Sequence, residues 1–157
     1  MKNSSFLVMA GLLLAACNSS NNNETVQAAP STKLPITGTW QLISGTTIEK
    51  TDTTVTRYTK TVSFIKIIND THFAFLKHDL TGGKDAAASF GAGGGKYTLT
   101  DNHYTEHLEY CSDRQWENND FSFTVTISND TLVQSGIEKV EAAGVNRINI
   151  EKYVRVK

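Results

Sequence analysis

Residues 36–157 alternate between apolar and polar side chains in short runs that are rich in Thr, Val, Ile, Tyr and Phe. Alternation with a period of two is typical of half-buried β-strands, and apolar spacing of the helical kind is nearly absent. The pattern therefore predicts one all-β domain of ordinary single-domain length. The candidate strands are 37–44, 53–68 (bent or broken), 71–78, 94–100, 103–110, 120–128, 131–135 and 146–156.

Three connections between these runs carry an Asn/Asp pair: "IINDTHF" (67–73), "TLTDNHYT" (98–105) and "TISNDTLV" (126–133). Both residue types tolerate the left-handed conformation that two-residue hairpin turns require. Consecutive strands should then be antiparallel neighbours. The sequence predicts an eight-stranded antiparallel up-and-down barrel, since closure removes both sheet edges, and a β-sandwich is the alternative.

The turn at Asp101-Asn102 fixes a register in which Leu99 faces Tyr104 and Tyr97 faces Glu106. The two faces of this hairpin then separate, and the more apolar one should point inward. The predicted interior face carries Tyr97, Leu99, Tyr104, Glu106, Leu108 and Tyr110, and the outer face carries Lys96, Thr98, Thr100, His103, Thr105 and His107.

The same reasoning applies to the other two turns. At Asn129-Asp130, Ile127 faces Leu132 and Val125 faces Gln134, with Phe121 and Phe123 on the same side. At Asn69-Asp70 the faces are mixed: Phe64, Phe73 and Phe75 share one with Lys66 and Lys77, and Ile65, Ile67, Ala74 and Leu76 share the other. We expect the phenylalanine face to point inward, with the lysines extending their charges to water.

Glu106 is the unusual member of the interior face, because an unpaired carboxylate in a dry barrel would tend to take up a proton. It could be a fixed polar element that accepts hydrogen bonds from a tyrosine hydroxyl, a buried water or an arginine. It could instead orient the polar head of an apolar ligand. The candidate ligand-binding residues are Glu106, Tyr97, Tyr104, Tyr110 and Phe75.

The amino terminus, "MKNSSFLVMAGLLLAAC", has Lys2 before an apolar run and small residues before Cys17, which predicts a secretory signal peptide over 1–16. The run is shorter than the ~20 residues of a bilayer-spanning helix. Leu14-Ala15-Ala16-Cys17 resembles the lipobox of bacterial lipoproteins, which implies cleavage before Cys17 and its acylation, with fatty acids such as palmitate. The alternative is a soluble secreted protein in which Cys17 is incidental.

Residues 17–35 then comprise the lipidated cysteine and a polar, amide-rich linker with no apolar periodicity, which should be flexible. Asn18 is not the aspartate that resembles an inner-membrane retention signal, and no acidic cluster follows Cys17. We therefore expect an outer-membrane lipoprotein that faces the periplasm, and surface display stays open.

Composition narrows the choice of partners. Removal of residues 1–16 leaves 14 basic and 16 acidic residues, a formal charge of −2, which argues against nucleic acid. Because Cys17 would be committed to lipid, Cys111 has no intramolecular disulfide partner, and we expect it to be a small buried hydrophobe rather than a nucleophile.

Two further motifs contain residues that could take part in chemistry. "SFGAGGGKY" (89–97) lacks a phosphate-loop signature, so we expect a mobile loop entering a strand, which with 78–88 could form a lid. His103 and His107 would lie about 13 Å apart at ~3.3 Å per residue, too far for one metal ion. We expect neither a metal nor a cofactor, and no catalytic residues.

"GTWQL" (38–42) matches the Gly-X-Trp of the first lipocalin strand, with Gly38 and Trp40 in the matching positions. "KIINDTHFAF", "GGGKYTLTDNHYTEHLEY" and "FSFTVTISNDTLV" resemble lipocalin-like lipoproteins of unknown function from gut Gram-negative bacteria of the Bacteroidota type. The resemblance implies a lipocalin-like barrel over 36–157. It also implies that Trp40 closes one end, with Arg155, or as second choice Arg147, packed across it.

Together these features predict a lipoprotein, held in the outer membrane through Cys17, whose barrel binds or carries a small hydrophobic or amphipathic ligand without catalysis. The alternative is a protein-interaction or inhibitor module with a filled barrel, whose partner would be another envelope protein. A barrel interior with room for no more than a few water molecules would exclude the carrier function.

Overall fold

A computed structural model describes residues 34–58, 60–84 and 88–157. The predicted signal peptide, Cys17 and most of the linker lie outside these residues. The described elements are nine strands, β1 (Gly38–Glu49), β2 (Asp52–Arg57), β3 (Val62–Ile68), β4 (His72–Asp79), β5 (Phe90–Thr100), β6 (His103–Cys111), β7 (Asn119–Ser128), β8 (Thr131–Val140) and β9 (Val145–Arg155), and two short 3₁₀ helices, η1 (Arg114–Trp116) and η2 (Glu141–Ala143).

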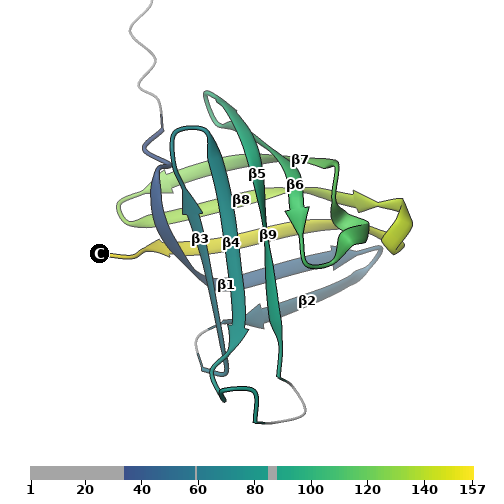
Figure 1. Ribbon diagram of the computed structural model, residues 1–157. Helices are drawn as coiled ribbons and strands as arrows, with labels where there is room; N and C mark the ends of the chain where they lie inside the picture. Colours follow the sequence, from purple (N-terminus) through teal and green to yellow (C-terminus); the bar gives the residue numbers. More distant parts are fainter. Residues whose placement is uncertain (1–33, 59, 85–87) are drawn as a thin grey trace, which may run out of the picture. The chain divides into compact units, whose positions relative to one another are not determined.

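The strands form the predicted closed eight-stranded antiparallel barrel. β3 to β9 pair consecutively, and β9 pairs with β1 to close the ring (Figure 1). β1 changes partner on its other edge: its first part pairs with β3, and its second part pairs with β2. The run predicted over 53–68 is thus broken into two strands, and β2 is an exposed extension of the ring.

The predicted registers at two turns are confirmed. Leu99 faces Tyr104 and Tyr97 faces Glu106, and in the next hairpin Val125 faces Gln134. The first residue of each turn, Asp101 and Asn129, has a positive φ of 54° and 53° respectively. Asp101 and Asn129 therefore adopt the left-handed backbone conformation that was predicted for the Asn/Asp pairs in these turns.

The Asn69 turn is longer than predicted, because Ile68 faces Phe73 rather than Thr71. The side chain of Asn69 holds this loop by accepting hydrogen bonds from the backbone N–H groups of Thr71 and His72, at 2.9 and 2.7 Å. A shift of two residues leaves every side chain on its predicted face.

Burial accordingly confirms the inward phenylalanine face: Phe73 is 3% exposed, whereas Ile67 on the opposite face is 41% exposed. The expectation that the lysines on this face reach water is wrong for Lys66, which is also only 3% exposed.

The prediction that Tyr110 points inward is wrong. A β-bulge shifts the β5–β6 register by one residue, so that Gly95 faces Leu108 but Gly94 faces Tyr110. A one-residue shift exchanges the two faces of a strand. Tyr110 is therefore 69% exposed, and Cys111 takes the inward position.

The glycine-rich segment is part of a strand rather than the mobile loop that was expected, since β5 begins at Phe90. Its glycines permit close approach: a Cβ on Gly93 would collide with the ring of Phe75, and one on Gly95 would collide with the backbone oxygen of His107. The lid over 78–88 stays a prediction, because residues 85–87 lie outside the described chain.

One end of the barrel is densely packed. Trp40 and Tyr104 are completely buried there, together with Ile36, Leu42, Val125 and Leu132. The indole N–H of Trp40 donates to the carbonyl of Ile36 at 2.7 Å. The guanidinium of Arg155 lies 4.0 Å from the centroid of the Trp40 ring and donates to the carbonyl oxygens of Thr37 and Pro35. Arg155 therefore ties both ends of the described chain to this end of the barrel.

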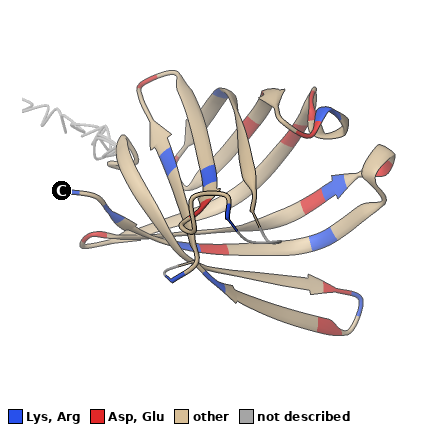
Figure 2. Cartoon of the chain, turned by 60° about the horizontal axis from the view of Figure 1, so that its bottom comes forward, with Lys and Arg blue, Asp and Glu red and all other residues tan. Residues whose placement is uncertain are grey.

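Acidic and basic positions are interspersed along the strands and loops (Figure 2). The interior also carries charge, because Lys66 on β3, Glu106 on β6 and Glu138 on β8 are all at least 91% buried. The barrel interior is therefore divided between an apolar end and a region with buried polar side chains.

We expect Gly95→Ala to lower the free energy of unfolding by about 1–3 kcal/mol, because the added methyl would press on the β6 backbone at the bulge. Gly91→Ala is the matched control in the same strand, since its Cβ would meet nothing closer than 3.9 Å. Urea unfolding followed by circular dichroism measures both, and equal stabilities of the two variants would contradict the assignment.

Candidate functional site

The half of the barrel away from Trp40 contains a partly open cavity of about 470 Å³. Its lining comes from the parts of the strands near the β1–β2, β6–β7 and β8–β9 connections, which lie at the opposite end from the three Asn/Asp turns. The apolar walls are formed by Phe64, Phe75, Leu108, Trp116, Phe121 and Phe123.

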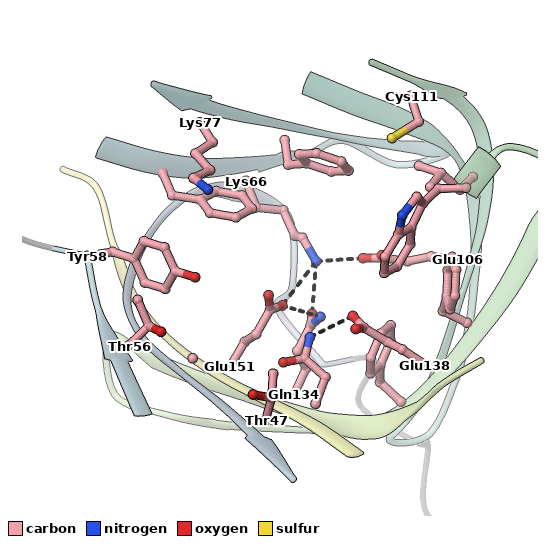
Figure 3. A pocket seen from close by; sticks show the side chains of 18 of the residues that line it. Thr47, Thr56, Tyr58, Lys66, Lys77, Glu106, Cys111, Gln134, Glu138 and Glu151 are labelled. Carbon is pink, nitrogen blue, oxygen red and sulfur yellow. Dashed lines mark hydrogen bonds and ion pairs between the residues drawn. The ribbon is translucent and has the colours of Figure 1, made fainter. Parts of the chain in front are cut away.

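A polar network crosses the inner part of this cavity (Figure 3). The Lys66 ammonium on β3 donates to the Glu106 carboxylate on β6 at 2.7 Å, and to the side-chain oxygen of Gln134 on β8 at 3.1 Å. A second carboxylate, that of Glu151 on β9, lies 3.9 Å from the same ammonium. One lysine on β3 thus contacts side chains of β6, β8 and β9.

Glu151 is held mainly by neutral donors. Its Oε2 accepts hydrogen bonds from the Gln134 amide at 2.7 Å and from the Tyr153 hydroxyl at 2.6 Å. Tyr153 is completely buried, and burial, reinforced by the nearby Glu151 carboxylate, raises the pKa of its hydroxyl well above the usual value. Tyr153 therefore stays a neutral donor to Glu151 at ordinary pH.

A second ion pair lies on the β8–β9 wall. Arg147 contacts Glu138 Oε2 through its Nε at 2.8 Å and its Nη2 at 2.7 Å, and Asn149 donates to Glu138 Oε1 at 2.7 Å. Burial raises the pKa of Glu138, and Arg147 opposes this shift. Arg147 also lies over the Trp116 ring, 5.6 Å from its centroid, so it links the polar wall to the aromatic one.

These β8 and β9 residues were missed by the sequence reading. Their strands invert the usual pattern, since Glu138 and Asn149 point inward while Ile137 and Ile148 are 63% and 41% exposed. The register at the Asn129 turn could have identified Glu138. It places Gln134 inward, and every second residue along the strand from Gln134 includes Glu138. The predicted strand ended at residue 135, so the alternation was not followed that far.

Of the candidate ligand-binding residues, the structure brings Glu106 and Phe75 together in the cavity lining. Tyr97 and Tyr104 lie in the packed core, with ring centroids 5.2 Å apart, and do not line the cavity. Tyr110 lies on the outer surface.

The expected partner of Glu106 was a tyrosine, a water or an arginine, and the observed one is Lys66. The Tyr97 hydroxyl donates instead to the carbonyl of Asn69 at 2.7 Å. The buried Tyr104 hydroxyl lies near Glu106 but forms no well-aligned hydrogen bond with the described residues. Burial, followed by the charge of Glu106, raises the pKa of Tyr104.

Cys111 lines the cavity as a free thiol, and burial raises its pKa, which disfavours the reactive thiolate. In the described part of the chain no three His, Cys, Asp or Glu side chains are grouped so that they could hold a metal ion. Arg147, the second choice for packing on Trp40, is in the cavity, and Arg155 occupies that position.

Comparison with models of known protein families gives no match, and comparison with curated proteins gives no significantly similar sequence. The helices within the described ranges are all too short to span a bilayer. The function must therefore be inferred from the cavity itself.

We expect Lys66→Met to lower the free energy of unfolding by about 3–5 kcal/mol, because it leaves the Glu106 carboxylate buried without its cation. Lys96→Met is the matched control: its pair with Glu109 spans 3.8 Å and the Lys96 side chain is 67% exposed, so the change should be below about 1 kcal/mol.

Thermal and urea unfolding measure both variants. Adding Glu106→Gln to Lys66→Met should restore part of the lost stability, since it removes the unpaired charge. Equal effects of the two lysine substitutions would show that the buried pair is not required for stability.

Proposed function

We propose that this protein is a lipid-anchored envelope protein whose barrel binds a small hydrophobic or amphipathic molecule. The observation that supports binding is the cavity of about 470 Å³, which lies within the ~300–1,000 Å³ typical of small-molecule sites. Its aromatic walls suit an apolar body, and its polar network suits a head group that forms hydrogen bonds.

The cavity also favours this function over a filled barrel that acts only as an interaction or inhibitor module. Such a module would need no space behind its surface, whereas here Phe75 and Glu106 face open volume. The proposed role is binding or carriage without catalysis. Docking of an envelope protein on the outer face would be compatible with that role.

The anchoring part of the proposal rests on the sequence "LAAC" at 14–17, which lies outside the described residues. Two or three acyl chains on Cys17 would hold the barrel at the outer membrane, since each buried CH₂ contributes ~0.8 kcal/mol. Relationship to lipocalin-like lipoproteins is part of the same proposal. The closed barrel and the Arg155 contact with Trp40 support it.

Filling the cavity should weaken binding. Cys111→Trp would place an indole in the cavity, whereas Tyr110→Trp, its neighbour on the same strand, would place one on the outer surface. We expect the first variant to weaken binding of the neutral fluorescent probe N-phenylnaphthylamine by about tenfold or more, roughly 1.4 kcal/mol, and the second to leave binding unchanged.

Fluorescence titration of the chain from residue 17 onward, carrying Cys17→Ser so that it has no acyl chains, measures the affinity. Circular dichroism establishes that both variants are folded. Absence of probe binding to the chain with its cavity intact, or equal affinities of the two variants, would contradict the proposed site.

Acylation is tested separately in a Gram-negative host supplied with an alkyne analogue of palmitate. We expect the full chain to incorporate the label and to sediment with the outer membrane. Cys17→Ser should lose both properties, and Cys111→Ser, which removes the other cysteine, should keep both. Labelling that survives Cys17→Ser would contradict the proposed anchor.

A further inference from the structure

Acidic side chains outnumber basic ones in the cavity lining, and they differ in how closely each is paired with an opposite charge. Three basic side chains, Lys66, Lys77 and Arg147, face four acidic ones, Glu106, Asp113, Glu138 and Glu151. The two cations of the inner network are already engaged at 2.7 Å, Lys66 by Glu106 and Arg147 by Glu138. Lys77 stands apart from the Lys66 group in Figure 3.

Among the three carboxylates Glu106, Glu138 and Glu151, Glu151 is the one without a close cation of its own. It lies 3.9 Å from the Lys66 ammonium, at the limit of an ion pair, and that ammonium is closer to Glu106. Both hydrogen bonds to Glu151 use Oε2, so within the described residues nothing donates to Oε1. The side chain of Glu151 is 15% exposed, compared with 4% for Lys66 and 8% for Glu106.

This exposure is toward the cavity, because Glu151 is on the inner face of β9 and is part of the cavity lining. Arg147 is more exposed, at 32%, but it is paired with Glu138, so Glu151 is the most accessible carboxylate of the inner network, and its Oε1 accepts no hydrogen bond from the described residues. An anionic head group would meet this carboxylate while the nearest cations are already paired. A protonated amine would instead supply the missing donor and the missing positive charge.

The walls suit the rest of such a ligand. Tyr58, Phe64 and Phe75 form one aromatic group, with Tyr58 and Phe64 edge to face at 5.8 Å and Phe64 and Phe75 tilted at 5.7 Å. Trp116 and Phe121 form another, at 5.8 Å. Aromatic faces attract cations as well as apolar groups. The inner network already contains such a cation–π contact, since the Lys66 ammonium lies 5.4 Å from the Tyr153 ring centroid.

We propose that the cavity takes hydrophobic organic cations, namely protonated primary amines on an aliphatic or aromatic body, with the ammonium donating to Glu151 Oε1. The inference rests on the proposed binding function and names the ligand class for that same cavity. It predicts that fatty acids bind more weakly than amines of equal chain length.

Three ligands of equal chain length test the proposal: decylamine, decanol and decanoate, each below its micelle concentration at pH 7. At this pH the amine is protonated and the acid is ionised. Each is titrated against N-phenylnaphthylamine bound to the chain from residue 17 onward with Cys17→Ser. We expect decylamine to displace the probe about tenfold more effectively than decanol, since the ammonium adds a charge–charge attraction to the hydrogen bond that a hydroxyl can also donate, and decanoate to be the weakest.

Glu151→Gln keeps the size of the side chain and an oxygen that Gln134 and Tyr153 can use, but removes the charge. We expect it to abolish the preference for decylamine over decanol while the decanol affinity stays the same. Glu141→Gln is the matched control, because its side chain is 84% exposed and lies outside the cavity lining. It should retain the full preference.

The outcomes separate this inference from the function on which it rests. Probe displacement in which decanoate equals or exceeds decylamine overturns the amine preference and leaves a hydrophobic binding site in place. Failure of the probe and all three ligands to bind overturns the binding function itself. If Glu151→Gln does not fold, the ranking of the three ligands on the unsubstituted cavity still decides the inference.

Discussion

The ion pair between Lys66 and Glu106 is the interaction on which the arrangement of the interior depends. Both side chains are more than 90% buried, and their charged atoms are 2.7 Å apart across the barrel. Neither charge could remain buried without the other, because desolvation of a single ion costs several kcal/mol. The pair therefore requires β3 and β6 to keep their registers. On one side of it lies the packed core around Trp40, and on the other lies the cavity.

Alternation of side chains explains which parts of the fold could be predicted. The Asn69 loop is two residues longer than expected, yet Phe73 and Phe75 keep their inward face, because an even shift preserves it. The bulge at Gly94 and Gly95 shifts the register by one, and Tyr110 exchanges places with Cys111. An error of two residues in the length of a turn did not change the predicted side-chain faces. One unrecognised bulge, in contrast, exchanged the inward and outward faces at the end of β6. Glycines in a strand can signal such a bulge, and here they were interpreted as a loop.

The candidate site was only partly predictable for a different reason. Glu106 was found because a short hairpin fixed its face locally. Its partner Lys66 is 40 residues away, and Gln134 is 68 residues from Lys66, so only closure of the barrel brings them together. Glu138 and Asn149 were harder still, since their inward positions contradict the rule that apolar side chains are buried.

That contradiction is itself an argument about function. If β8 and β9 were arranged for stability alone, Ile137 and Ile148 would point inward, and Glu138 and Asn149 would be exposed to water. The chain does the reverse, and it keeps open volume beside the buried charges although apolar side chains could fill it. Proteins tend to break the rules of stable packing where a site requires it. The opposite end, where Arg155 covers Trp40 and binds the carbonyls of Thr37 and Pro35, buries mainly apolar and aromatic side chains. The departures lie in the half of the barrel that holds the cavity, which is where a ligand would replace the missing contacts.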